Sequence, residues 1–224
     1  MTQFTAKSDL PGVRIVKLGG SLLDEPRLPE LLRRWLDAQP QAVDVLVAGG
    51  GRLVDVVRDL DRVQTLGDER AHWLALRAMS VTAALLRELL SGSAYVEDLN
   101  TLVEEIRHGS SRQTIVFDCW QFLRCVEAST PGERLPKSWQ ATSDSVAARL
   151  SVALAHHEIA PAELVLLKST TSACEATLDD AAAAGIVDEC FPRQAATLPS
   201  VRIVNLRSRG FDEIVYPAGG RRPS

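Results

Sequence analysis

Short apolar segments alternate with helical patterns along this chain, and this alternation constrains its fold more than any other feature. The predicted strands are Val13–Leu18, Val43–Ala48, Ala94–Val96, Gln113–Phe117, Leu164–Leu167 and Val201–Leu206. The predicted helices are Arg27–Ala38, Arg52–Leu60, Asp68–Leu90, Glu97–Arg107, Ser143–His156 and Leu178–Ala184. Strand and helix in alternation predict an α/β fold in which helices cover both faces of a mainly parallel sheet.

The longest predicted helix has an apolar stripe whose spacing is typical of a buried helix face. The stripe consists of Leu74, Ala78, Val81, Leu85 and Leu89. Gly92 follows as a C-terminal stop. We therefore expect this stripe to pack on the core.

Composition favours a globular protein that binds small molecules. The chain has 224 residues, of which 46% are hydrophobic and 24% charged, so it can bury a core of one or two small domains. The net charge is −4, and basic residues cluster no further than in pairs such as Arg221-Arg222, which disfavours nucleic acid and anionic membranes as partners.

The chain also lacks the marks of a membrane or secreted protein. No apolar run is long enough for a spanning helix, and residues 1–11 lack the apolar core of a signal peptide, so we expect a cytoplasmic location. The four cysteines have neither zinc-site spacing nor the density of a disulfide scaffold. We expect reduced and mostly buried thiols.

A lysine and a glycine turn mark the end of the first predicted strand. Lys17 lies in the strand Val13–Leu18, which leads directly into Gly19-Gly20-Ser21. Such a strand exit brings backbone N–H groups and an ammonium to one point, as the binding of an oligophosphate requires. The alternative is an ordinary turn after a strand.

A second glycine turn follows the next strand. Gly49-Gly50-Gly51 separates the strand Val43–Ala48 from a helical pattern, so a ligand can approach the backbone where a helix N-terminus points its unpaired N–H groups. This arrangement predicts a second anion site. A dinucleotide fingerprint is the rival interpretation, but Val54 stands where its third glycine belongs, and no P-loop string is present.

An acidic helix start and a second lysine extend the set. Thr142 or Ser143 is suited to be the N-cap of the helix Ser143–His156, with Asp144 in its first turn. Asp144 there could simply stabilise the helix dipole, by ~0.3–1 kcal/mol. Lys168 ends the apolar run Leu164–Leu167 and precedes Ser169. Two strand-exit lysines, two glycine turns and one acidic helix start make a consistent set for phosphoryl transfer.

The set resembles a known superfamily in order and spacing. Its motifs are Lys17-x-Gly19-Gly20-Ser21, Gly49-Gly50-Gly51, Thr142-Ser143-Asp144-Ser145-x-Ala147 and Lys168. They are similar to those of the amino acid kinase superfamily, which includes carbamate, acetylglutamate, aspartate, uridylate and isopentenyl phosphate kinases. The resemblance implies a three-layer αβα sandwich of the carbamate kinase type. Within one continuous sandwich it implies an acceptor-binding part at 13–137 and a nucleotide-binding part at 138–216, between flexible segments at 1–12 and 217–224.

The resemblance also implies roles for individual residues. Lys17 and Lys168 would neutralise the transferring phosphoryl group, and Asp144 would orient both lysines. ATP would be bound by Lys17, Gly19, Gly20, Ser21, Lys168 and Ser169, and the acceptor by Gly49, Gly50, Gly51, His72, Arg77, Thr142 and Ser143. Mg²⁺ would be held mainly by the phosphates, so no protein metal ligand is expected. A homo-oligomer is expected.

Two further strings resemble one branch of the superfamily. They are Trp139-x-x-Thr142-Ser143-Asp144-Ser145-Val146-Ala147 and Ala71-His72-Trp73-Leu74-Ala75-Leu76-Arg77-Ala78-Met79. They are similar to the branch that includes the aminomethylfuran phosphate kinase of methanofuran synthesis and its bacterial relatives, which implies a small phosphomonoester as the acceptor. Uridylate kinases carry an aspartate near the position of His72, so its absence here disfavours a nucleotide acceptor.

Three alternatives remain open from the sequence. His72 could be an ordinary surface or packed residue of its helix. The chain could be a uridylate kinase, or a non-catalytic binder of a nucleotide or anion that keeps the fold. One departure from the superfamily concerns the nucleotide side: many members have a V-D-G-x-Y segment after the second lysine, whereas Lys168 is followed here by Ser169-Thr170-Thr171-Ser172-Ala173-Cys174. This departure predicts a shortened nucleotide-binding half.

Overall fold

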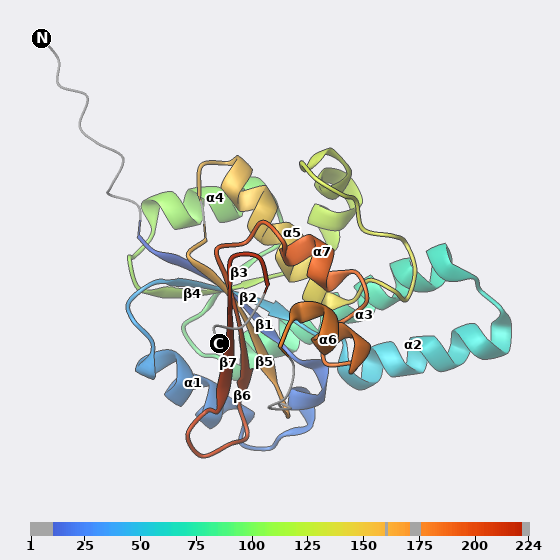
Figure 1. Cartoon of the computed structure of the whole chain (residues 1–224), viewed down its shortest axis with the longest axis horizontal. Helices are drawn as coiled ribbons and strands as arrows, with labels where there is room; N and C mark the ends of the chain where they lie inside the picture. The colour runs from blue at the N-terminus through green and yellow to red at the C-terminus, as the bar shows by residue number, and fades with distance from the viewer. Residues whose placement is uncertain (1–10, 160, 171–175, 221–224) are drawn as a thin grey trace, which may run out of the picture.

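One sheet organises the molecule. The computed structural model describes residues 11–159, 161–170 and 176–220, and seven strands in these ranges form a sheet of order β3-β4-β2-β1-β5-β6-β7 (Figure 1). The strands are β1 (Val13–Leu18), β2 (Val43–Ala48), β3 (Ala94–Val96), β4 (Gln113–Phe117), β5 (Glu163–Lys168), β6 (Ser200–Asn205) and β7 (Glu213–Pro217). All neighbours are parallel except β6 and β7, which confirms the predicted sheet.

The helices lie where the sequence predicts them, within a few residues. They are α1 (Leu28–Ala38), α2 (Gly51–Gln64), α3 (Asp68–Leu89), α4 (Leu99–His108), α5 (Ser143–His156), α6 (Leu178–Ala183) and α7 (Phe191–Ala195). Short turns of 3₁₀ helix add Gly20–Asp24 (η1) and Glu127–Ser129 (η3), and a single π turn adds Phe122–Val126 (η2). Helix α7 and strand β7 were not predicted, because a segment of five residues shows too little periodicity to distinguish a helix or strand from a loop.

The sheet is buried on both faces, so the protein has the predicted three layers. Side chains alternate across the pleat of each strand, and one face packs under α4, α5, α6 and α7. The other face packs under α1 and the C-terminal half of α3. Because both faces are covered, most strand residues are apolar rather than alternating with polar ones.

Most of the apolar stripe predicted for α3 faces outward, so that prediction is wrong except at Leu89, which packs against the core. Leu74, Val81 and Leu85 are 47%, 58% and 46% exposed. A second apolar series on the same helix is buried instead, and it comprises Ala71, Ala75, Leu76, Ala83 and Leu86. The helix is apolar on two faces, and the spacing alone does not indicate which of them meets the sheet.

Helices α2 and α3 run side by side and project beyond the sheet (Figure 1). No residue of α2 is buried, and its Leu53, Val56, Leu60 and Val63 are all at least 42% exposed. This pair of helices therefore carries the largest exposed apolar side chains of the described residues.

The expectation for the cysteines is confirmed only in part, and that for the chain termini falls mostly outside the described residues. Cys119 and Cys190 are buried but Cys125 is exposed, and Cys174 lies outside the described residues. Within the described ranges, no helix combines the length and the apolar character needed to cross a membrane. The segment 1–10 and the tail 221–224, which we expected to be flexible, also lie outside the description, whereas Pro217 belongs to β7.

A buried arginine holds the long connection from β4 to α5. Arg149 of α5 is 1% exposed, and its Nε donates to Glu127 Oε1 at 3.0 Å. Its other nitrogens donate to the carbonyls of Pro131, Thr130 and Glu127. Glu127 Oε1 also accepts from the backbone N–H of Leu135. One guanidinium thus fixes the loop that leads to residues 138–142.

We expect Arg149→Ala to lower the free energy of unfolding by about 3–5 kcal/mol, because it leaves the Glu127 carboxylate buried without its partner. Urea denaturation measures the difference. Arg134→Ala is the matched control, since Arg134 is exposed in the same loop. A loss below about 1 kcal/mol for Arg149→Ala would show that the arginine does not hold the loop.

Candidate active site

The pleat of two neighbouring strands brings the two predicted lysines together. In β1, Val13, Ile15 and Lys17 point to the face covered by α5, and in β5 the corresponding series is Leu164, Leu166 and Lys168. Strands β1 and β5 are adjacent and parallel, although about 150 residues separate them in the sequence. Each lysine is the last residue of its strand on this face, so both ammonium groups meet the start of α5.

Asp144 lies between the two lysines at that helix start. Lys17 Nζ is 2.9 Å from Asp144 Oδ1, and Lys168 Nζ donates to Oδ2 at 2.7 Å. The three side chains are 6%, 15% and 4% exposed for Lys17, Lys168 and Asp144. Two ammonium groups share one carboxylate, so the cluster of Lys17, Asp144 and Lys168 has one excess positive charge that is largely shielded from solvent. Such a cluster suits a bound anion.

Burial and pairing act in opposite directions on these groups. Burial lowers the pKa of Lys17 to about 8, although attraction to Asp144 works against that shift. Burial would raise the pKa of Asp144, but attraction to Lys168 and Lys17 outweighs it and lowers that pKa to about 2. At neutral pH Asp144 is therefore ionised, and Lys17 is mostly charged.

The two glycine turns pack against each other, backbone to backbone. A Cβ added to Gly20 would lie 2.3 Å from the nitrogen of Gly51, and one added to Gly49 would lie 2.6 Å from the nitrogen of Gly20. Gly51 also has a φ of +53°, which L side chains adopt only with strain. These positions need glycine for packing as well as for any ligand.

Two of the predicted N–H donors already have partners. The N–H of Gly19 donates to the carbonyl of Leu167, and that of Gly49 donates to the carbonyl of Leu18. The first N–H groups of η1 and α2 are different, because neither element start has a side-chain cap and the first turn of a helix has no internal acceptors for them. The donors that remain for an anion thus come from the residues that begin η1 and α2.

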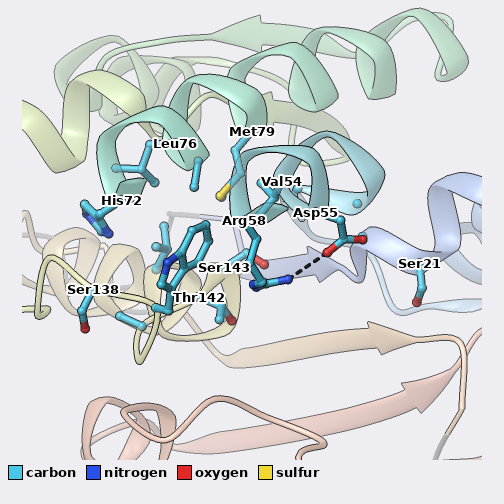
Figure 2. Close-up of a pocket in the computed structure, with 17 residues that line it drawn as sticks. Ser21, Val54, Asp55, Arg58, His72, Leu76, Met79, Ser138, Thr142 and Ser143 are labelled. Atoms are coloured by element: carbon cyan, nitrogen blue, oxygen red, sulfur yellow. Dashed lines mark hydrogen bonds and ion pairs between the residues drawn. The ribbon is translucent and has the colours of Figure 1, made fainter. Parts of the chain in front are cut away.

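A pocket opens beside the glycine turns (Figure 2). Its volume is about 240 Å³, below the roughly 300–1,000 Å³ of pockets for drug-sized ligands, so it suits a small molecule. Its walls come from η1, α2, α3 and residues 138–146, and the lining residues are Gly20, Ser21, Gly50, Gly51, Val54, Asp55, Arg58, His72, Ala75, Leu76, Met79, Ser138, Trp139, Ala141, Thr142, Ser143 and Val146. The pocket therefore draws on both parts that the sequence divided at residue 137.

Most residues predicted for the acceptor line this pocket, but Gly49 does not, and neither does Arg77. Its guanidinium lies 3.6 Å from the centroid of the Trp120 ring instead. His72 is 8% exposed, and burial, with repulsion from Lys137, lowers the pKa of its imidazole. His72 is therefore neutral at pH 7 and can offer a hydrogen bond but no charge.

The cationic group of the pocket is Arg58, which the sequence analysis missed. Arg58 donates to Asp55 Oδ1 at 2.8 Å and lies 4.7 Å from the centroid of Trp139 (Figure 2). Trp139 in turn donates its Nε1–H to Asp61. The spacing of Gly51, Asp55 and Arg58 along α2 was a usable signal, because positions four and seven residues after the glycine share its face.

A serine pair joins the glycine turn to the exit of β5. Ser21 Oγ donates to Ser169 Oγ at 3.0 Å, so these two of the six residues predicted for ATP lie side by side. The segment that replaces V-D-G-x-Y falls largely on residues 171–175, which lie outside the described residues. The predicted shortening of the nucleotide half therefore stays a prediction.

Comparisons with known proteins agree with this fold. No family model matches the chain. Among curated proteins, it is similar to the (5-(aminomethyl)furan-3-yl)methyl phosphate kinase of Methanocaldococcus jannaschii, with 26% identity over 135 residues, which are 60% of this chain and 57% of the relative. The matched region thus spans little more than half of the relative's length.

Comparison with solved structures bears on the fold alone. The aspartate kinase from Synechocystis superposes with a TM-score of 0.53 at 15% identity, over 92% of this chain and 40% of that one. The uridylate kinase from Archaeoglobus fulgidus gives 0.48 at 16% identity, over 71% of this chain and 63% of that one. The aspartate kinase shares the fold, and together with the curated relative it confirms the resemblance to the amino acid kinase superfamily.

We expect Asp144→Asn to lower the free energy of unfolding at pH 7 by about 3–5 kcal/mol, because two buried ammonium groups lose their shared carboxylate. The folded pKa of Asp144, about 2, lies below the ordinary 3.8. Its contribution is therefore complete above about pH 4 and is lost as the pH falls toward 2. Denaturation between pH 2 and 7 should show the difference between variant and wild type shrinking over that window.

Asp179→Asn is the control, since Asp179 is an exposed aspartate of α6. The free energy of unfolding of Asp179→Asn should follow that of the wild type at every pH. A stable Asp144→Asn protein at pH 7 would contradict the charge balance described for the cluster.

Proposed function

We propose that this chain is an ATP-dependent kinase that transfers the γ-phosphoryl group to a small acceptor. The observation that carries this proposal is the buried cluster of Lys17, Asp144 and Lys168, with its excess positive charge, beside a pocket that begins at the glycine turns. The curated relative and the two solved structures are all kinases by name, which supports the same reaction class.

The site fits a nucleoside triphosphate in three respects. Gly20 and Gly51 expose backbone where a side chain would not fit, the element starts beside them have N–H groups without caps, and the cluster holds positive charge. Lys17, Lys168, Gly20, Ser21 and Ser169 would hold the phosphates. Mg²⁺, held mainly by the phosphates, would neutralise their charge when bound. In this proposal the nucleotide lies over 138–216 and the acceptor over 13–137.

Charge neutralisation is the main chemical task of these residues. An acceptor oxygen attacks the γ-phosphorus while the bond from that phosphorus to the bridging oxygen breaks, and ADP leaves. Negative charge spreads over the transferring group in this step, so positioned cations stabilise the transition state more than covalent chemistry would. Lys17 and Lys168 supply these cations, and Asp144 keeps both ammonium groups aimed at one point.

The pocket favours an acceptor that has a small apolar body and an anionic group. Val54, Leu76 and Met79 give it an apolar wall, and Arg58, which pairs with Asp55, supplies a cation. A phosphomonoester with a small ring, such as the aminomethylfuran phosphate in the relative's name, matches both features. A role in making a methanofuran- or methanopterin-type cofactor follows from that acceptor.

Two alternatives stay open beside this proposal. Uridylate would need room for a base and a ribose, which a pocket of about 240 Å³ does not favour. A non-catalytic binder of a nucleotide or anion would keep the cluster without turnover. The expected cytoplasmic location stays a prediction, as does the homo-oligomer, for which the exposed apolar side chains of α2 and α3 are the natural contact surface.

Replacement of Lys17 or Lys168 by Ala should lower turnover by roughly 10²–10³-fold with a smaller effect on KM, because each removes one electrostatic contact to the transition state. Release of ADP with saturating ATP and acceptor measures the effect. Lys137→Ala is the control, because Lys137 is an exposed lysine paired with Glu69. A Lys17→Ala variant that keeps most of the wild-type turnover would overturn the assignment.

The acceptor can be tested with Arg58. Arg58→Ala should lower kcat/KM for aminomethylfuran phosphate by about 10–100-fold, the scale of one charge-assisted hydrogen bond worth about 1.5–3 kcal/mol. Arg52→Ala is the matched control, since Arg52 lies on the same helix with its side chain 80% exposed. Wild-type protein should prefer this acceptor to UMP under the same ATP and Mg²⁺ conditions. If UMP is the better substrate by an order of magnitude, the acceptor proposal is wrong and the kinase proposal stands.

A further inference from the structure

Asp188 binds the start of α5 from outside that helix. It lies between α6 and α7, and its two carboxylate oxygens accept hydrogen bonds from five donors. The donors are the backbone N–H of Thr142 at 2.9 Å, the Thr142 hydroxyl at 2.8 Å, the backbone N–H of Ser145 at 3.1 Å, the Ser145 hydroxyl, and the backbone N–H of Cys190 at 3.1 Å. One side chain thus joins the α6–α7 connection to the helix that carries Asp144.

These contacts replace an ordinary helix cap. Thr142 is the N-cap, but its hydroxyl is 3.5 Å from the N–H of Asp144, which is long for a hydrogen bond. The same hydroxyl donates to Asp188, so the geometry of this first turn is set by a residue more than 40 positions away. Thr142 and Ser145 flank Asp144 in the sequence, two positions before it and one after. A movement of Asp188 would therefore move the backbone of Asp144.

Asp188 also contributes charge. Its carboxylate faces the positive end of α5 and adds a second negative charge near the cluster of Lys17, Asp144 and Lys168. The attraction is weaker than that of Asp144, but it favours the ammonium form of Lys17. Asp188 thus acts on the cluster in two ways, through its hydrogen bonds to the first turn of α5 and through its negative charge.

We propose that Asp188 is a positioning residue of the phosphoryl-transfer site, which fixes the Asp144 carboxylate between the two lysines by holding the first turn of α5. This inference rests on the proposed function only where it predicts an effect of Asp188 on turnover. Asp188 touches neither lysine in the hydrogen bonds of the structure, so its effect must pass through Thr142, Ser145 and the electrostatic field.

The test compares Asp188→Asn with Asp179→Asn, which removes the same charge from an exposed position of α6. Asp188→Asn should lower kcat on the order of 10–100-fold, the range for removing an outer partner of a site residue, and leave KM for ATP and acceptor within about threefold. Asp179→Asn should change neither constant. Equal kcat values for Asp188→Asn and wild type would overturn the proposal.

A second readout does not depend on activity. NMR titration of lysine side chains labelled with ¹³C, assigned with a Lys17→Arg variant, gives the pKa of Lys17 in the free protein. That pKa should fall below the wild-type value in Asp188→Asn, because a negative charge near Lys17 is lost, and it should not change in Asp179→Asn. An unchanged Lys17 titration in Asp188→Asn would overturn the proposal even if the wild type transfers no phosphoryl group. A lower pKa would support it in that case too, so the two proposals can fail separately.

Ser145→Ala covers the case in which Asp188→Asn does not fold. It removes one hydroxyl partner of Asp188 and leaves all charges in place. We expect a loss of kcat of about 3–10-fold with the Lys17 titration unchanged, the size of one hydrogen bond worth about 1 kcal/mol. No change in kcat would count against the proposal.

Discussion

The shared carboxylate of Asp144 is the interaction on which the rest of this site depends. Two ammonium groups cannot be buried side by side without a negative partner, because desolvation and mutual repulsion both oppose their charged forms. Asp144 offsets much of that cost, and its two oxygens separate the lysines onto opposite sides of one group. The cluster still keeps one excess positive charge, which a bound phosphate can neutralise. We therefore propose that the site holds an anion.

The sheet makes that arrangement possible. The ends of adjacent parallel strands lie at the same edge of the sheet, and β1 and β5 bring Lys17 and Lys168 together there although they are far apart in the sequence. The glycine turns after β1 and β2 then pack within contact of each other's backbone, which leaves N–H groups rather than side chains at the entrance of the pocket. The fold thus brings two lysines, backbone N–H groups and an apolar pocket wall to the same edge of the sheet.

The sequence predicted the parts of this site that are local and missed those that depend on packing. The two lysines, the glycine turns and Asp144 all lie in short motifs. Their places, at strand ends for the lysines and glycines and at a helix start for Asp144, could therefore be predicted from the sequence. The outward face of α3 was predicted wrongly, because a helix with two apolar faces does not specify which one meets the sheet. Arg77 was misplaced for the same reason. Its position in the sequence shows that it belongs to α3 but does not show that its side chain stacks on Trp120. Asp188 gave no signal of its role, because four of its five donors belong to Thr142 and Ser145, more than 40 positions away.

Calorimetric titration of the protein with Mg-ADP and with a non-hydrolysable ATP analogue tests the central claim most directly. A site with excess positive charge and backbone N–H donors should bind both nucleotides with a Kd in the millimolar range or lower. It should lose most of that affinity in a Lys17→Ala variant that remains folded. Measurable heat that disappears in the variant is the result we predict. No heat, together with no thermal stabilisation at millimolar nucleotide, would contradict the account.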